Sequence, residues 1–200
     1  MAKGPAYNVP FRRRRKGKTD YESRRALVLS RLPRLVIRGT SKHLIVQVIE
    51  AEVEGDRVVA SANSRELREK FGFQGGCGNL PAAYMTGLLC GYRAASSGVE
   101  EMILDLGLQT PSKGARVFAA LKGVLEAGVM IPHKSEVLPE ESRISGQHIV
   151  DYANQLSSDP DLYQRRFSGY LSRGLRPEDL SEHFSSIKEK IVSSFEEEGL

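Results

Sequence analysis

The residues of this chain best suited to chemistry are cations clustered near its start. The run from Arg12 to Lys18 holds six positive charges in seven positions. Such a density of like charge repels itself and is stabilised by a polyanion, and guanidinium groups bind phosphate oxygens through paired hydrogen bonds. The pattern therefore predicts phosphate binding, and it favours nucleic acid as the partner over a solubility tail or a targeting signal.

Charge is divided unevenly along the chain. The first 42 residues hold 13 Lys or Arg and 2 acidic residues, whereas the other 158 hold 16 and 23, so the net charge of +4 combines a basic front with an acidic remainder. Phosphate contacts of the front would weaken with salt, with a slope of about −0.7 to −0.9 per contact. We expect the front to supply affinity for a polyanion and the remainder to fold.

Two carboxylates suggest an alternative to simple phosphate binding, namely a metal-dependent nuclease of ribonuclease-H-like build. Glu50 and Asp105 fall on separate predicted strands and would have to converge on Mg²⁺. Two carboxylates without a third make a poor metal site, and both are explained as charges at strand ends. The glycine-rich stretch from Phe71 to Gly78 is not a phosphate loop, because no Gly-Lys-Ser/Thr follows it. We therefore predict no catalytic residue, metal or cofactor.

Apolar patterning and cysteine content exclude other classes. No apolar run approaches the roughly 18 to 20 residues that a membrane helix needs, and no apolar signal segment follows the basic start. Cys77 and Cys90 are too few for a disulfide scaffold or a Cys-rich zinc site. We expect a cytoplasmic protein without a membrane partner.

The elements that position the cations begin with an arm. Residues 1–18 contain Pro5 and Pro10 and few aliphatic side chains, so we expect the arm to be disordered until it binds. Thr19 and Glu22 match a capping box, which predicts a short helix that ends before Pro33.

An α/β body should follow this helix. The β-branched segments 35–37, 44–49 and 58–62 predict three strands whose short turns imply an antiparallel meander. Further along, the spacing predicts a central helix over 80–92 capped by Asn79, a strand over 101–108, a helix over 117–125 and a last short strand over 129–131. This order indicates a mixed sheet, an antiparallel meander followed by alternating helix and strand in a ribonuclease-H-like arrangement, covered by helices.

The end of the chain predicts a helical C-terminal extension. Apolar stripes over 149–156 and 180–195 indicate two helices. Between them, Tyr163 to Tyr170 interleaves aromatic residues and arginines, which suits either base stacking or a loop anchored by its aromatic side chains. We therefore divide the chain into an RNA-binding arm (1–19), an α/β body with its leading helix (20–132) and the extension (133–200).

Several short motifs, in order along the chain, resemble one known family. The motifs are Gly4-Pro5, Val9-Pro10, Thr19-Asp20-Tyr21, Pro33 to Val36, Ser41-Lys42-His43, Ala60 to Ala62, Gly78 to Tyr84 and Leu104 to Leu108. Together they resemble the archaeal form of large-subunit ribosomal protein L-eighteen, which binds 5S rRNA. The resemblance implies a non-enzymatic constituent of the large ribosomal subunit, holding 5S rRNA against 23S rRNA and neighbouring ribosomal proteins in the central protuberance.

Residue chemistry and the resemblance together predict a set of RNA contacts. Cations of the arm would neutralise phosphates, cations beside the first two strands would be held by rigid backbone, and the family places RNA contacts around its matching Ser-Lys-His stretch. The predicted contacts are Arg12, Arg13, Arg14, Arg15, Lys16, Lys18, Arg24, Arg25, Arg34, Arg38, Ser41, Lys42, His43, Lys113 and Arg116. We expect shape and phosphate spacing to fix the position more than base identity does.

Overall fold

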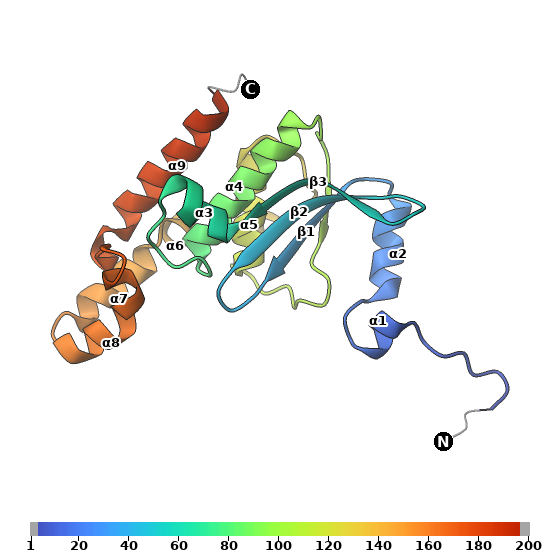
Figure 1. The fold of residues 1–200 in the computed structure, drawn as a ribbon, viewed down its shortest axis with the longest axis horizontal. Helices are drawn as coiled ribbons and strands as arrows, with labels where there is room; N and C mark the ends of the chain where they lie inside the picture. The colour runs from blue at the N-terminus through green and yellow to red at the C-terminus, as the bar shows by residue number, and fades with distance from the viewer. Residues whose placement is uncertain (1–3, 197–200) are drawn as a thin grey trace.

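A four-stranded sheet lies at the centre of the computed structural model, which describes residues 4–196 (Figure 1). Its strands are β1 (Arg34–Gly39), β2 (Leu44–Ala51), β3 (Asp56–Asn63) and β4 (Ile103–Asp105), in the order β3-β2-β1-β4. The first three pair antiparallel through short turns, and β4 runs parallel to β1. The predicted α/β class, with a meander inside a mixed sheet, is confirmed.

Alternation along the strands gives the sheet two different faces. Leu35 and Ile37 on β1 are fully buried on one face, together with Val46 and Val48 on β2. Helices α4 (Leu80–Ser96) and α5 (Arg116–Glu126) cover this face, and a short α3 (Ser64–Phe71) leads into the loop before α4 (Figure 1). The predicted helical covering therefore holds for this face.

The two covering helices approach each other closely because of their glycines. A Cβ on Gly87 of α4 would lie 2.0 Å from the carbonyl oxygen of Ala120 on α5. On α5, a Cβ on Gly123 would lie 2.2 Å from the carbonyl oxygen of Tyr84. As predicted, Asn79 caps the start of α4, and its side chain accepts a hydrogen bond from the Ala82 amide.

Helix α2 (Tyr21–Leu29) lies beside the opposite face of the sheet. Its N-cap is Asp20 and not the predicted Thr19, because the Asp20 carboxylate accepts hydrogen bonds from the Glu22 and Ser23 amides. Before it, the single turn α1 (Arg12–Arg15) occupies an arm that we expected to lack structure. So short a helix with no buried residue is marginal in water, so disorder of the free arm stays a prediction.

The fourth strand is shorter than the sequence indicated. The Asp105 carboxylate accepts a hydrogen bond from the Gly107 amide, and Gly107 has a φ of +62°, so the chain turns away after three strand residues. The last predicted strand, over 129–131, is reduced to a single bridge between Met130 and Glu101.

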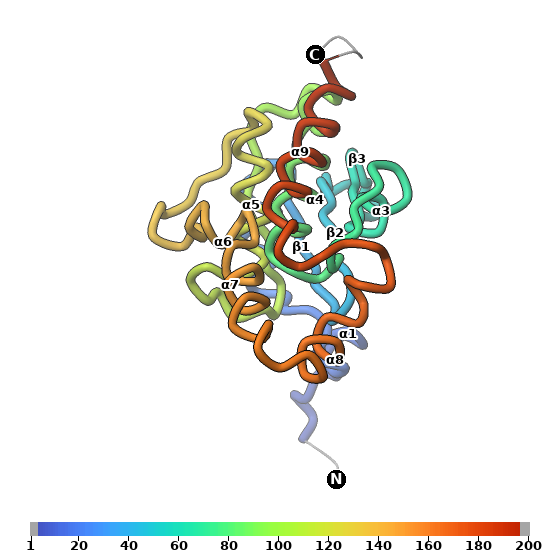
Figure 2. Tube along the Cα trace, turned by 90° about the vertical axis from the view of Figure 1, so that its left-hand side faces the viewer, coloured from blue at the N-terminus to red at the C-terminus, as the bar shows by residue number. Residues whose placement is uncertain are grey.

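Helices form the C-terminal extension, and they pack on the body. These are α6 (Glu141–Ser145), α7 (Gln147–Leu156), α8 (Pro160–Leu171) and α9 (Leu180–Glu196), with short 3-10 turns at Ser135–Val137 and Pro177–Asp179. Figure 2 shows α9 crossing in front of α4, where Leu180, Ile187 and Ile191 join the buried core. No helix within residues 4–196 is long and apolar enough to cross a membrane.

Helix α8 corrects the prediction of a loop between the two tail helices. Asp159 accepts a hydrogen bond from the Leu162 amide, and Pro160 occupies the first turn. The Asp-Pro pair therefore begins a helix between the two that the apolar stripes indicated. Its aromatic residues anchor it, since Phe167 is buried and the Tyr170 hydroxyl accepts a hydrogen bond from Asn79.

Candidate nucleic-acid interface

A groove of about 1170 Å³ lies between the arm, α2 and the face of the sheet that α4 and α5 leave open. Val36 and Gln47 form part of its floor, and the loop after β4 forms one wall. Five cations line it, namely Arg13, Lys18, Arg24, Arg34 and Arg38. The groove therefore brings together five of the fifteen predicted contacts, from the arm, the leading helix and the first strand.

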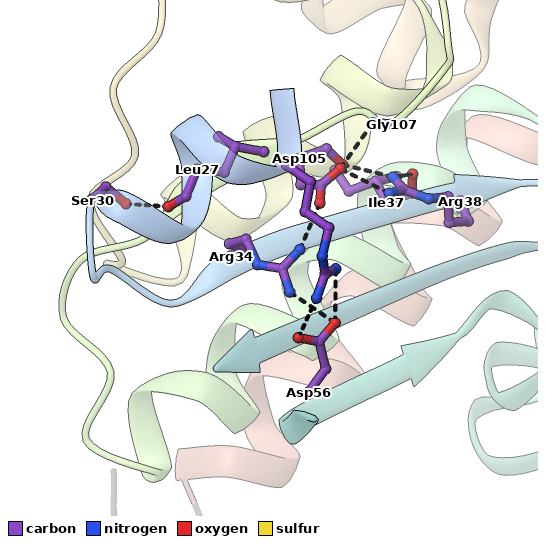
Figure 3. A network of polar contacts seen from close by, with 9 residues as sticks. Leu27, Ser30, Arg34, Ile37, Arg38, Asp56, Asp105 and Gly107 are labelled. Carbon is purple, nitrogen blue, oxygen red and sulfur yellow. Dashed lines mark hydrogen bonds and ion pairs between the residues drawn. The ribbon is translucent and has the colours of Figure 1, made fainter. Parts of the chain in front are cut away.

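A network of ion pairs fixes the floor of the groove (Figure 3). The guanidinium of Arg34 lies between two carboxylates, 2.9 Å from Asp56 and 3.0 Å from Asp105. Arg24 of α2 donates two hydrogen bonds to Asp56, at 2.8 and 3.0 Å, and Arg38 donates one to Asp105 at 2.8 Å. Three arginines thus share two aspartates.

The ion pairs of this network favour the charged forms of Asp56 and Arg24. The hydrogen bond from Arg24 and the proximity of Arg34 lower the pKa of Asp56 despite partial burial. The same hydrogen bond raises the pKa of Arg24. Both shifts favour these charged forms. By formal charge, three arginines and two aspartates leave the network one net positive charge.

The three arginines of the network differ in their exposure to solvent. The side chain of Arg34 is 2% exposed, whereas those of Arg24 and Arg38 are 37% and 41% exposed. This burial gives no support to an RNA contact by Arg34, and its two ion pairs give it a structural role. Arg24 and Arg38 keep part of their guanidinium surface towards the groove.

The carboxylates proposed for the nuclease are occupied by other partners. Asp105 accepts from two arginines and from the Gly107 amide, and Glu50 lies 3.8 Å from Arg57. Among residues 4–196, no group of three or more His, Cys, Asp or Glu side chains could hold a metal ion. The structure therefore offers no support for the nuclease hypothesis.

Cations of the arm are the most available ones at the groove. All six of the run from Arg12 to Lys18 are exposed, and so is Arg25 on α2. Arg13 donates a hydrogen bond to the Thr19 hydroxyl at 2.8 Å, and the rings of Phe11 and Tyr21 lie 5.1 Å apart. These contacts hold the arm against the start of α2, at the mouth of the groove.

The remaining predicted contacts lie at the other end of β1. Ser41 and Lys42 are exposed in the turn between β1 and β2, and His43 is half-buried with its amide bonded to Thr40. Arg116 donates to the carbonyl oxygens of Thr40 and Gly78, so it fastens this turn to the glycine-rich loop. Exposed Lys113 pairs with Glu136 at 3.1 Å. The structure therefore does not bring these residues into the groove.

Comparison with known proteins places the chain in a family. The family model described as "Ribosomal large subunit proteins 60S L5, and 50S L18" matches residues 5–102 and 96–134. The chain belongs to this family. One curated family member, large ribosomal subunit protein uL18 of the archaeon Caldivirga maquilingensis, is 51% identical over 196 residues, which cover 98% of this chain and 95% of the relative. The resemblance seen in the sequence motifs is thereby confirmed.

Sequence reasoning about this family member missed Asp56, the residue that joins α2 to the sheet. Asp56 lies 32 positions from Arg24, so no local pattern connects them. Its place in the Glu54-Gly55-Asp56 turn indicated only a strand boundary. Asp56 is placed beside Arg34 by the pairing of β3 with β2 and of β2 with β1.

Proposed function

We propose that this protein is a structural, non-enzymatic constituent of the large ribosomal subunit that binds 5S rRNA and helps attach it to 23S rRNA in the central protuberance. One observation carries the proposal: Arg13 and Lys18 of the exposed arm line the same groove as Arg24 of α2 and Arg38 of β1. Membership of a family of large-subunit ribosomal proteins agrees with it, and with a location on the ribosome in the cytoplasm.

Arm and floor would contribute differently to binding. Arg24 and Arg38 are partly neutralised by Asp56 and Asp105, so they fix the position of a phosphate more than they add charge. The arm supplies net charge, because its guanidinium groups are exposed and can bind phosphates in pairs. Recognition would then depend on the shape and phosphate spacing of the RNA more than on its base sequence.

Two finer expectations belong to this proposal. Neighbouring ribosomal proteins would dock on the acidic remainder of the chain, where a polyanion is repelled. The sheet order β3-β2-β1-β4 is compatible with a ribonuclease-H-like build used as a binding scaffold without the metal chemistry.

Titration of 5S rRNA at several salt concentrations tests the proposal. The variant Arg14→Ala/Arg15→Ala should bind more weakly, and the slope of log affinity against log salt should flatten by about 1.4 to 1.8 for two lost phosphate contacts. The control variant Lys134→Ala/Arg143→Ala also removes two exposed cations, but neither belongs to the arm. An unchanged slope in the arm variant, or equal flattening in both variants, would overturn phosphate binding by the arm.

A further inference from the structure

A glycine-rich loop over 72–79 joins α3 to α4, and it has few side chains of its own with which to hold a shape. Four of its eight residues are glycine, the residue whose backbone loses the most freedom on folding. The conformation of this loop therefore depends on contacts that other segments supply.

Two side chains of the C-terminal extension hold the loop at Gln74. Arg173, in the segment after α8, donates a hydrogen bond through its Nε to the carbonyl oxygen of Gln74. His183 of α9 accepts a hydrogen bond at Nε2 from the Gln74 amide, at 3.0 Å. Both backbone polar groups of one loop residue are thus bonded to side chains 99 and 109 positions away. We call this pair of contacts the Gln74 clamp.

Aromatic side chains fit the loop to the same extension. The ring of His183 stacks on the fully buried Phe73, with ring centres 5.5 Å apart and planes 12° apart. A Cβ on Gly75 would lie 2.3 Å from the Phe73 ring, so the loop backbone passes directly over that ring. A Cβ on Gly76 would lie 3.4 Å from the hydroxyl of Tyr170 on α8. The loop is therefore packed against the extension as well as bonded to it.

The far end of the loop lies against the β1–β2 turn over 40–43. A Cβ on Gly78 would lie 2.8 Å from the carbonyl oxygen of Ser41 and 3.3 Å from that of Lys42. Arg116 joins the two segments, because it donates to the carbonyl oxygens of Gly78 and Thr40. Movement of the loop backbone at Gly78 would therefore displace the turn or break the Arg116 contacts.

We propose that Arg173 and His183 are positioning residues that set the conformation of the β1–β2 turn through Gln74 and the glycine-rich loop. The inference rests on the proposed function and deepens it, because this turn carries three of the predicted RNA contacts. It gives the C-terminal extension a task besides packing, which is to hold a turn of the body in one shape.

The Gln74 clamp requires a neutral His183. Its Nε2 accepts the hydrogen bond from the Gln74 amide, so this nitrogen carries no proton of its own. Burial lowers the pKa of His183, and the charge of Lys190 on the same helix lowers it further. Protonation would remove the acceptor and open the clamp on the side of α9.

Cations surround the place where a protonated His183 would add its charge. Lys190 comes from α9 itself, Arg173 from the segment after α8, and Arg68 from α3, which packs on α9. Burial and then the charge of Arg68 lower the pKa of Arg173, so these groups are close enough to interact. The carboxylates of α3 already pair with other cations, namely Glu66 with Lys70 and Arg93, and Glu69 with Arg65.

Amide hydrogen exchange of the full-length chain without RNA, resolved by NMR, tests this inference. The Gln74 amide reports the clamp, and the Thr40 amide, bonded to the His43 carbonyl oxygen at 2.8 Å, reports the turn. His183→Phe keeps a ring on Phe73 but has no acceptor, so protection at both amides should fall by about tenfold, as for one lost hydrogen bond. His183→Gln keeps an acceptor and should retain most of the protection.

Arg173 provides a second variant and a matched control. Arg173→Gln removes the guanidinium that holds the Gln74 carbonyl oxygen, so protection of the Thr40 amide should fall as it does in His183→Phe. Arg165→Gln removes an exposed cation of α8 and should leave both amides unchanged. Protection of the Leu121 amide inside α5 should stay constant in every variant, which shows that the fold is intact.

The pH profile separates positioning from packing. The folded pKa of His183 lies below its ordinary value of 6.5, so the clamp is closed above pH 6.5 and is lost as pH falls below it. Protection factors of the unaltered chain should decrease over this range at both amides, and those of His183→Gln should not. His43 titrates in both chains, so the difference between them isolates His183.

Three results would overturn the inference. The first is full protection of the Thr40 amide in His183→Phe and Arg173→Gln, which would mean that nothing reaches the turn. The second is an equal fall at Leu121, which would assign the effect to general unfolding. The third is the same pH profile in the unaltered chain and His183→Gln. Because no RNA is present, a failure to bind 5S rRNA would sink the proposed function and leave these results standing.

Discussion

Arg34 at the start of β1 and Asp56 at the start of β3 form an ion pair of 2.9 Å across the strand between them. Arg24 of α2 binds the same carboxylate, although α2 has no buried residue of its own. The position of α2, and with it the direction in which the arm leaves the body, therefore depends on polar contacts more than on apolar packing (Figure 3).

Replacement of the shared carboxylate should loosen this connection. In Asp56→Asn, one acceptor oxygen and the negative charge that Arg24 and Arg34 share are lost. We expect the free energy of unfolding to fall by about 1 to 3 kcal/mol, the usual cost of leaving a buried charged donor without its acceptor. Urea denaturation measures this change. The exposed neighbour Glu54 provides the control, and a Glu54→Gln variant as unstable as Asp56→Asn would contradict the role of the network.

Acid should weaken the contact between α3 and α4 through Glu66. Burial alone would raise the pKa of Glu66, but hydrogen bonds from Arg93, from the Asn63 amide and from Lys70 outweigh it and lower the pKa to about 2. A lowered pKa in the folded state means that stability is present above the ordinary value of 4.5 and is lost as pH falls towards 2.

This pH dependence is checked by measuring the free energy of unfolding of the unaltered protein and of Glu66→Gln from pH 6 down towards pH 2. Their difference should be largest near pH 6 and should shrink below pH 4.5, since protonation of Glu66 removes the same charge as the substitution. A difference that is constant across the range would show that ionised Glu66 makes no contribution.

The C-terminal extension should contribute to the stability of the whole fold. Ile187 on α9 is 1% exposed and belongs to the core that α4 and α5 share. Ile187→Ala should therefore cost about 2 to 5 kcal/mol through lost burial and a residual cavity. Thermal unfolding should remain a single transition at a lower temperature. Lys190→Ala, on the exposed side of the same helix, should have little effect, and equal midpoints for the two variants would mean that α9 is not packed as described.

Much of the body followed from residue periodicity. Short β-branched segments joined by short turns located β1 to β3, and the apolar surface around 80–92 located α4 at the centre. These patterns are reliable because strand and helix periods determine which side chains share a face. Helix α8 was missed because its Asp-Pro start is also typical of a turn, and the two cases differ in whether the following residues find a surface on which to pack.

The sequence by itself determined the positive charge of the arm, the three strands of the meander, the central helix and the family. Tertiary structure alone decided which cations are available to a ligand. Arg34 is buried against Asp105, 71 positions away, and Arg116 is fastened to Thr40, 76 positions away, whereas Lys42 and the arm remain exposed. The physical reason is that an arginine carries the same charge in any sequence pattern. Whether its guanidinium group faces solvent or a carboxylate depends on distant segments that only folding brings together.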